Sequence, residues 1–173
     1  METTNQLKNT FNEVIEELKP IFPEITNNTY TVCFNSTAKK RLGQCKRLKD
    51  NNFEININKL FAKVCPIIAV KNTMVHEILH SLPSGFSHKG KWIQYANIVN
   101  HRFPHYHITR LARYTEYAKV MDDQIKYIVK CPTCNNTWRY FRQTKMISYL
   151  KNTKNNTRYS CPNCKSWVTL EKY

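Results

Sequence analysis

Residues 75–80 read Val75-His76-Glu77-Ile78-Leu79-His80, which is the pattern H-E-x-x-H. On an α-helix, His76 and His80 lie one turn apart on the same face, so both imidazoles can reach one Zn²⁺ ion at about 2.0–2.1 Å. Glu77 adjoins the first histidine, where its carboxylate can take a proton from a metal-bound water instead of binding the ion. The segment therefore predicts a metal-dependent hydrolase, most often a protease. The alternative is a surface helix with scattered histidines and glutamates.

The residues around the motif favour a helix with one face in the core. The apolar ones are Val70, Met74, Val75, Ile78 and Leu79. Asn72 or Thr73 can cap the start of this helix. Pro83 and Gly85 predict that it ends soon after His80.

A catalytic zinc site usually has three protein ligands and one open position. His88 returns within a short loop after the helix, and we expect it to be the third ligand. Three further histidines follow the next predicted helix and are interpreted as surface or substrate-side residues: His101, His105 and His107. A metzincin is excluded because Pro83 occupies the required glycine position. A thermolysin-like site with a distant carboxylate ligand stays open, and Glu116 is its only candidate before the C-terminal cysteines.

Four cysteines near the C-terminus form a second metal signature. They occur as Cys131-Pro132-Thr133-Cys134 and Cys161-Pro162-Asn163-Cys164, separated by residues 135–160. Two such pairs are typical of a closed, tetrahedral, structural zinc site, so residues 124–173 are predicted to be a zinc ribbon. The alternative is two unrelated reduced pairs or a redox pair. A module with so few apolar residues should lose its fold without metal.

Length and composition predict one compact domain at 1–123 followed by this small ribbon. The chain has no apolar run long enough to span a membrane, and its polar start has no signal-peptide core. We therefore expect a cytoplasmic protein, nucleoid-associated or, in a eukaryotic host, nuclear. In that setting the remaining cysteines, Cys33, Cys45 and Cys65, are reduced thiols, and Cys33 and Cys65 lie in apolar stretches that predict a core position. The sequence leaves the oligomeric state open.

The charge of the chain predicts a polyanionic partner, with DNA, single-stranded or damaged, as the first choice. The formal net charge is +15, and no acidic residue occurs between Gln124 and Leu170. Basic side chains there can pair with phosphates while aromatic faces stack on bases. The candidate nucleic-acid contacts are Arg139, Arg142, Lys145, Lys151, Lys154, Arg158, Trp138 and Tyr140. A second basic cluster begins with Lys39-Lys40-Arg41. The alternative is a solvated lysine-rich surface whose aromatics belong to the ribbon core.

Hydrophobic periodicity places the other elements. A helix is expected over 7–18, ended by Pro20. Strands are expected over 30–34, 42–48 and 53–57, and Asn58 can cap a short helix that follows. A helix over 92–99, a loop over 100–107 and a strand over 127–129 complete the prediction, while 109–123 is ambiguous between helix and linker.

Several of these segments together resemble the SprT-like zinc metallopeptidase family, which includes the Spartan proteases. The matching pieces are Gly43-Gln44-Cys45, the strand 53–57, the H-E-x-x-H segment, His88-x-Gly90-x-Trp92, the lead-in 127–131 and the two cysteine pairs. They span about Tyr30 to Trp167.

The resemblance implies an α+β fold: a zincin-like core, with a small antiparallel sheet packed on helices, followed by a β zinc ribbon. It implies one catalytic zinc held by His76, His80 and His88, with Glu77 as general base, and one structural zinc held by the four cysteines. The implied substrates are proteins associated with or crosslinked to DNA. Two alternatives stay open: a non-catalytic nucleic-acid-binding or transcription-associated zinc protein, and a hydrolase for a non-protein substrate.

Overall fold

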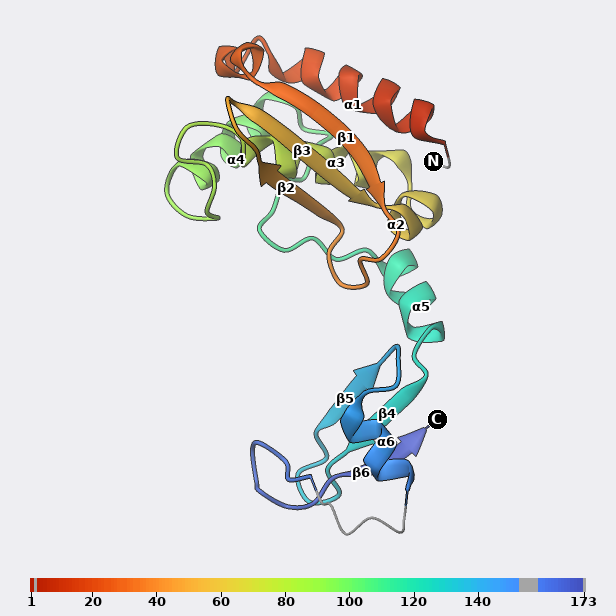
Figure 1. Ribbon diagram of the computed structural model, residues 1–173. Coiled ribbons are helices and arrows are strands. Elements are labelled where there is room, and N and C mark those ends of the chain that lie inside the picture. Colours follow the sequence, from red (N-terminus) through yellow and green to blue (C-terminus); the bar gives the residue numbers. More distant parts are fainter. Residues whose placement is uncertain (2, 153–158, 173) are drawn as a thin grey trace. The chain divides into compact units, whose positions relative to one another are not determined.

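The computed structural model describes residues 1, 3–152 and 159–172, and the chain divides into two compact units, Met1–Ala118 and Lys119–Tyr173. Each unit has its own sheet (Figure 1). Among the described residues, no helix combines the length and the apolar character that a membrane crossing requires.

The first unit is a mixed α+β structure. Its elements are α1 (Thr4–Leu18), the 3₁₀ turn η1 (Pro23–Asn27), β1 (Thr29–Asn35), β2 (Gly43–Arg47), β3 (Asn52–Asn58), α2 (Lys59–Val64), α3 (Ile67–Leu79) and α4 (Lys91–Arg102). Helix α5 (Thr115–Asp123) spans the boundary between the units. The predicted first helix is confirmed: Thr3 and Gln6 form a capping box at its start, and it ends at Leu18, just before Pro20.

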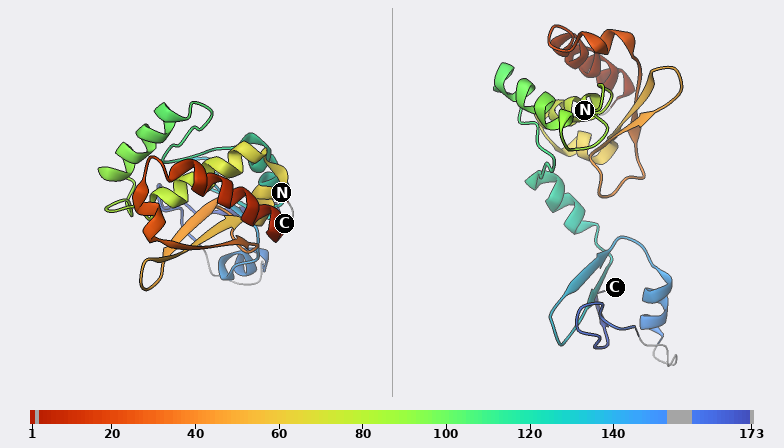
Figure 2. Two further views of the ribbon diagram at one scale, coloured as in Figure 1. Left: turned by 90° about the horizontal axis from the view of Figure 1, so that it is seen from above. Right: turned by 90° about the vertical axis from the view of Figure 1, so that its left-hand side faces the viewer.

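The sheet of the first unit has the order β1-β3-β2. Strand β2 is antiparallel to β3, but β1 is parallel to β3, with Val32 opposite Ile55. The expected antiparallel sheet is therefore observed for β2 and β3, and it is wrong for β1, which is parallel to β3. The reason is that β2 turns back through residues 48–51 to form a hairpin with β3, and β3 is then inserted between the two earlier strands. Helix α1 contacts β1, and α3 contacts β2 and β3, so the helices cover one face of the sheet (Figure 2).

Asn58 holds together the end of the sheet where the chain crosses from β1 to β2. Its side-chain oxygen accepts from the Phe61 backbone N–H and caps α2, as the sequence predicts. Its amide donates to the carbonyls of Ala38 and Arg41 and to the Tyr117 hydroxyl. One buried side chain therefore fixes both the start of a helix and the crossover loop 36–42.

Helix α3 carries the H-E-x-x-H segment through the core. It begins at Ile67 after Pro66, not at the predicted caps Asn72 and Thr73, which lie buried inside the helix. Both polar side chains are satisfied there: the Thr73 hydroxyl donates to the Ala69 carbonyl, and Asn72 accepts from the backbone N–H of His107. The apolar run 67–70 therefore belongs to the helix: burial of Ala69 and Val70 outweighs the absence of a polar cap, while Ile67 and Ile68 remain exposed.

The second unit is a small three-stranded sheet with one helix. Strands β4 (Tyr127–Lys130), β5 (Thr137–Tyr140) and β6 (Thr169–Lys172) have the order β5-β4-β6, and α6 (Lys145–Lys151) lies between β5 and β6 in the sequence. The buried side chains that form its core cluster are Val129, Cys131, Ile147, Cys161 and Val168. Two of these five are cysteines, so the apolar core alone is small for independent stability.

We predict that Asn58→Ala lowers the free energy of unfolding by about 2–3 kcal/mol, since it removes a helix cap and leaves the two loop carbonyls without their donor. Equilibrium urea unfolding followed by helical circular dichroism measures this. The matched control is Asn27→Ala at an exposed position, which should change the midpoint little. Equal effects of the two substitutions would contradict the role assigned to Asn58.

Candidate metal centres

Three histidine side chains converge at the C-terminal end of α3. His76 lies in the helix, His80 directly follows its last residue, and His88 returns from the loop beyond it. The Nε2 atom of His88 lies 2.8 Å from Nε2 of His76 and 3.1 Å from Nε2 of His80. Separations near 3 Å are close to those of three nitrogen ligands bound tetrahedrally to one ion at about 2.0–2.1 Å. The three imidazoles form a group that could hold a metal ion.

Backbone carbonyls determine which ring nitrogen faces the centre of this group. Nδ1 of His76 lies 3.0 Å from the Thr109 carbonyl oxygen, and Nδ1 of His80 lies 2.9 Å from that of Gly85. A carbonyl oxygen only accepts, so Nδ1 of each neutral ring carries the proton and Nε2 carries a lone pair. Two lone pairs therefore point at Nε2 of His88. This donor set fits a cation, and the carbonyl contacts are those that hold metal-binding histidines in other proteins.

The side chain of Trp92 packs against all three histidines. Its ring centroid lies 4.7, 5.6 and 4.8 Å from those of His76, His80 and His88. The side chain is buried, and its indole N–H has no hydrogen-bond partner among the described residues. The sequence indicated Trp92 only as a helix position and a piece of the family pattern, and its contact with all three imidazoles was not predicted.

Glu77 is buried beside the histidines. Burial raises the pKa of its carboxyl group to about 7, although the backbone N–H of Cys45 and the charge of Arg41 act in the opposite direction. Strand β2 passes very close: a Cβ atom on Gly43 would lie 2.7 Å from Oε1 of Glu77 and 2.8 Å from Thr73. Only glycine therefore fits at position 43, and the close approach brings the Cys45 N–H to the carboxylate.

The histidines themselves are held neutral. Burial, together with the nearby His80 and His88, lowers the pKa of His76 to about 3. Burial also lowers the pKa of His80 and His88. Neutral imidazole is the form that binds metal, so the site is already in its ligand state at neutral pH.

These residues open onto a cavity of about 390 Å³. Its walls come from residues 40–45, residues 107–112 and Tyr114, with Phe86 and His88 from the loop after α3. The wall at 107–114 is fixed by side-chain contacts to the helices: Asn100 bonds both backbone groups of Ile108, at 2.7 and 3.0 Å. Gly90, with φ +52°, turns the chain from the His88 loop into α4.

Of the other residues considered from the sequence as metal ligands, only His107 lines the cavity. His107 is exposed at the cavity wall, whereas His105 approaches Glu17 at 3.9 Å and His101 is exposed on α4. Glu116 belongs to a different surface depression and is not grouped with the histidines among the described residues. The observed group thus consists of His76, His80 and His88.

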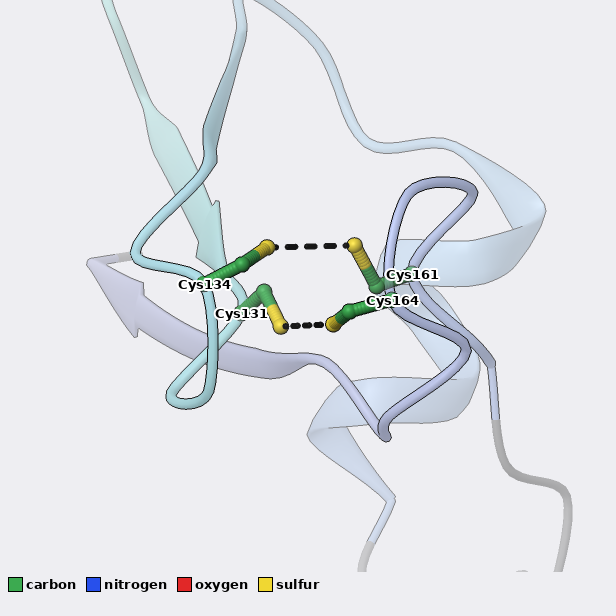
Figure 3. A group of neighbouring side chains, drawn as sticks. All are labelled: Cys131, Cys134, Cys161 and Cys164. Carbon is green, nitrogen blue, oxygen red and sulfur yellow. Dashed lines mark hydrogen bonds between the residues drawn. The ribbon is translucent and has the colours of Figure 1, made fainter.

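The four cysteines of the second unit form another group that could hold a metal ion (Figure 3). The sulfur atoms of Cys131 and Cys164 lie 3.4 Å apart, and those of Cys134 and Cys161 lie 3.5 Å apart. These separations are too long for a disulfide and fit thiolates arranged around one ion at about 2.3 Å.

The two cysteine turns have the same backbone geometry. The backbone carbonyl of Cys131 accepts from the N–H of Asn135, and the backbone carbonyl of Cys161 accepts from the N–H of Lys165, each at 2.9 Å. Asn135 and Lys165 both have positive φ, 56° and 63°. The backbone N–H of Ser166, followed by its side chain, holds the pKa of Cys164 below its usual range. This environment favours the thiolate, the form that binds metal.

The candidate nucleic-acid contacts fall into different settings. Trp138 and Tyr140 pack against the ribbon core, and Arg139 pairs with Asp122 at 2.8 Å. Arg142, Lys145 and Lys151 are exposed, with Lys145 and Lys151 near the rings of Tyr149 and Tyr127. Lys154 and Arg158 lie outside the described residues. Trp167, absent from the candidate contacts, has an exposed fraction of 52%.

Searches against protein-family models and against curated proteins found no match to this chain.

We predict that Glu77→Gln stabilises the metal-free protein at neutral pH. The folded-state pKa of about 7 exceeds that of the unfolded chain, so the wild type gains stability below about pH 4.5 and loses it as the pH rises through about 7. The advantage of the variant should therefore be greatest above pH 7 and vanish in acid. Urea midpoints of EDTA-treated samples across this range test the prediction, and an advantage that grows on acidification would contradict it.

We predict that Cys161→Ser abolishes one equivalent of bound metal and the fold of the second unit. Elemental analysis and the dispersion of amide NMR signals measure the two effects. Cys33→Ser is the control, because that thiol only donates to Asn56 on the sheet of the first unit. Full metal content and unchanged dispersion in Cys161→Ser would rule out a metal-dependent ribbon.

Proposed function

We propose that the chain is a zinc-dependent metalloendopeptidase of SprT-like type that acts on proteins associated with DNA. The observation that carries this proposal is the buried carboxylate of Glu77 next to three converging, neutral imidazoles at an open cavity. A structural metal site needs no such carboxylate. A buried titratable group with a strongly shifted pKa in a cleft is a typical feature of catalytic sites.

The donor set fits zinc: three imidazole nitrogens leave the fourth position of a tetrahedral ion open, as in hydrolytic zinc sites. When bound, zinc would polarise the scissile carbonyl and make a water more acidic. Glu77 then accepts the proton from water and passes it to the leaving amine. Its pKa lies near neutral pH in the metal-free protein, which suits a group that must both take and give a proton.

The remaining residues of the site hold this arrangement. The Cys45 N–H orients the Glu77 carboxylate, and Gly43 leaves room for it. The Thr109 and Gly85 carbonyls fix the rings of His76 and His80. We assign the first unit to the zincin-like fold on the same grounds: a metal-site helix runs beneath a strand that contacts its glutamate.

The second unit is proposed to hold a structural zinc and to bind DNA. Its support is the absence of acidic residues from Gln124 to Leu170, with exposed cations at Lys126, Arg142 and Lys145. Binding of this kind weakens steeply with salt, because each phosphate contact releases counterions. It would keep the peptidase close to proteins on the same nucleic acid.

The second candidate is a nucleic-acid-binding zinc protein without activity. The charge of the second unit favours it equally. The difference lies in Glu77, whose burial costs free energy that a non-catalytic site has no reason to retain.

We predict that the zinc-loaded protein hydrolyses casein, more rapidly with single-stranded DNA present, and that Glu77→Gln lowers kcat by about a hundredfold to ten-thousandfold. The variant should keep its metal and its DNA affinity. Glu16→Gln on the exposed face of α1 is the control. Arg142→Gln with Lys145→Gln should remove the stimulation by DNA but not the basal rate.

Bound zinc and DNA without hydrolysis in the wild type would favour the second candidate. Hydrolysis that is unchanged in Glu77→Gln would remove the assigned general base.

A further inference from the structure

Three cations surround the cavity of the first unit. Lys40 and Arg41 come from the loop before β2, and Arg110 comes from the segment that follows α4. All three are exposed. None of them takes part in an ion pair among the described residues. Among the described residues that line the cavity, Glu77 is the only one with a carboxylate, and it is buried beside the histidines.

The loop that carries Lys40 and Arg41 is held in place from beneath. Asn58 donates to the Arg41 carbonyl at 3.1 Å and to that of Ala38 at 2.8 Å. The Tyr117 hydroxyl lies between Asn58 and the Lys39 carbonyl, 2.9 Å from each. Buried hydrogen bonds therefore fix the backbone conformation of this exposed, basic loop. Lysines that serve only solubility would not need a backbone that is fixed in this way.

The segment that carries Arg110 is held in the same manner. The Asn72 side chain accepts from the His107 N–H at 3.1 Å, and Asn100 bonds both backbone groups of Ile108. The carbonyl of Thr109 contacts His76. Arg110 thus follows directly after a residue that orients a metal-site histidine.

Both arginines line the same cavity as Glu77 and the three histidines. A cation at the wall of a cavity attracts an anionic side chain bound there more strongly than it would in open solvent, because the dielectric constant of the wall is low.

Two large apolar side chains lie among the cations. Phe86 has an exposed fraction of 55% and Leu111 one of 76%, and both line the cavity. An aliphatic wall such as Leu111 suits an amino-acid side chain better than a sugar-phosphate backbone, which offers it no apolar surface. The combination favours a polypeptide that presents one apolar residue with carboxylates beside it.

We propose that this cavity selects acidic polypeptide segments, in which aspartate or glutamate flanks an apolar residue at the reacting position. This inference rests on the proposed peptidase function and specifies its substrate class. Arg41 and Arg110 are the specificity residues, each from a different segment of the cavity lining, and Lys40 adds charge next to Arg41. The preference belongs to the first unit and is separate from DNA binding by the second.

The test uses the full-length, zinc-loaded Glu77→Gln protein, which keeps the cavity but does not turn substrate over. Three fluorescein-labelled peptides share a central Leu-Ala pair and differ only in flanking glutamate, glutamine or lysine residues. We expect the glutamate peptide to bind most tightly. Arg41→Gln and Arg110→Gln should each weaken its binding by about fivefold, the upper range for an exposed ion pair, and leave the glutamine peptide unaffected.

Charge reversal sharpens the test. Arg41→Glu with Arg110→Glu should shift the preference to the lysine peptide. Arg102→Glu, at an exposed position near the end of α4, changes the charge of the same unit as much as either single reversal, Arg41→Glu or Arg110→Glu, and should leave the preference unchanged. High salt should reduce the advantage of the glutamate peptide.

Cleavage of the same three peptides by the otherwise wild-type protein separates the two proposals. Cleavage without a preference for the glutamate peptide overturns the acidic selectivity and leaves the peptidase function standing. Selective binding of the glutamate peptide without any cleavage overturns the peptidase function and supports the selectivity of the cavity. Weaker binding of single-stranded DNA in the two arginine variants, with equal affinity for all peptides, would assign these arginines to nucleic acid and end the proposal.

Discussion

Two backbone carbonyl oxygens, those of Thr109 and Gly85, decide how the histidines of α3 face the cavity. Each accepts from an Nδ1 atom and so leaves an Nε2 lone pair directed at His88. The helix alone brings His76 and His80 to one side, but it does not set their ring orientation or their tautomer. The ring orientation and the tautomer depend on two later segments, which bring the carbonyl groups of Gly85 and Thr109 next to the histidines. The fold beyond the helix therefore serves to bring two carbonyls and one further imidazole to the same place.

Hydrogen bonds from asparagine side chains hold the segments around the cavity in place. Asn58 fixes the loop before β2, while Asn72 and Asn100 fix the segment that contains Thr109. A side-chain amide can donate and accept hydrogen bonds at the same time. One such side chain can therefore satisfy backbone groups in two loop segments. The cost of leaving those groups unpaired keeps the cavity walls in one conformation. The rigidity of the site thus arises from polar contacts at its rim as well as from the apolar core below.

The sequence predicted the features that depend on local spacing and did not predict those that depend on distant partners. His76, Glu77 and His80 lie within one helical turn, and each cysteine pair lies within one turn of backbone, so their geometry follows from the chain itself. The cap at Asn58 is likewise local. The parallel pairing of β1 with β3, the contact of His76 with Thr109 and the packing of Trp92 under three imidazoles join residues far apart or in different elements. No periodicity records such contacts. The predicted start of α3 was wrong for a related reason. Asn72 and Thr73 resemble cap residues in the sequence, but both lie inside the helix, where other segments or the helix backbone satisfy their side chains.

The electrostatics of the cavity connect its chemistry to its selectivity. Burial keeps three imidazoles neutral and makes the ionised form of Glu77 costly. A bound dication offsets that cost, because its charge is the largest in the site and favours a carboxylate beside it. With Glu77 ionised next to a dication, the net charge at the centre of the cavity remains positive. On the proposed function, Arg41 and Arg110 would add to this field instead of cancelling it, so a substrate carboxylate near them would be attracted both by the arginines and by the metal site.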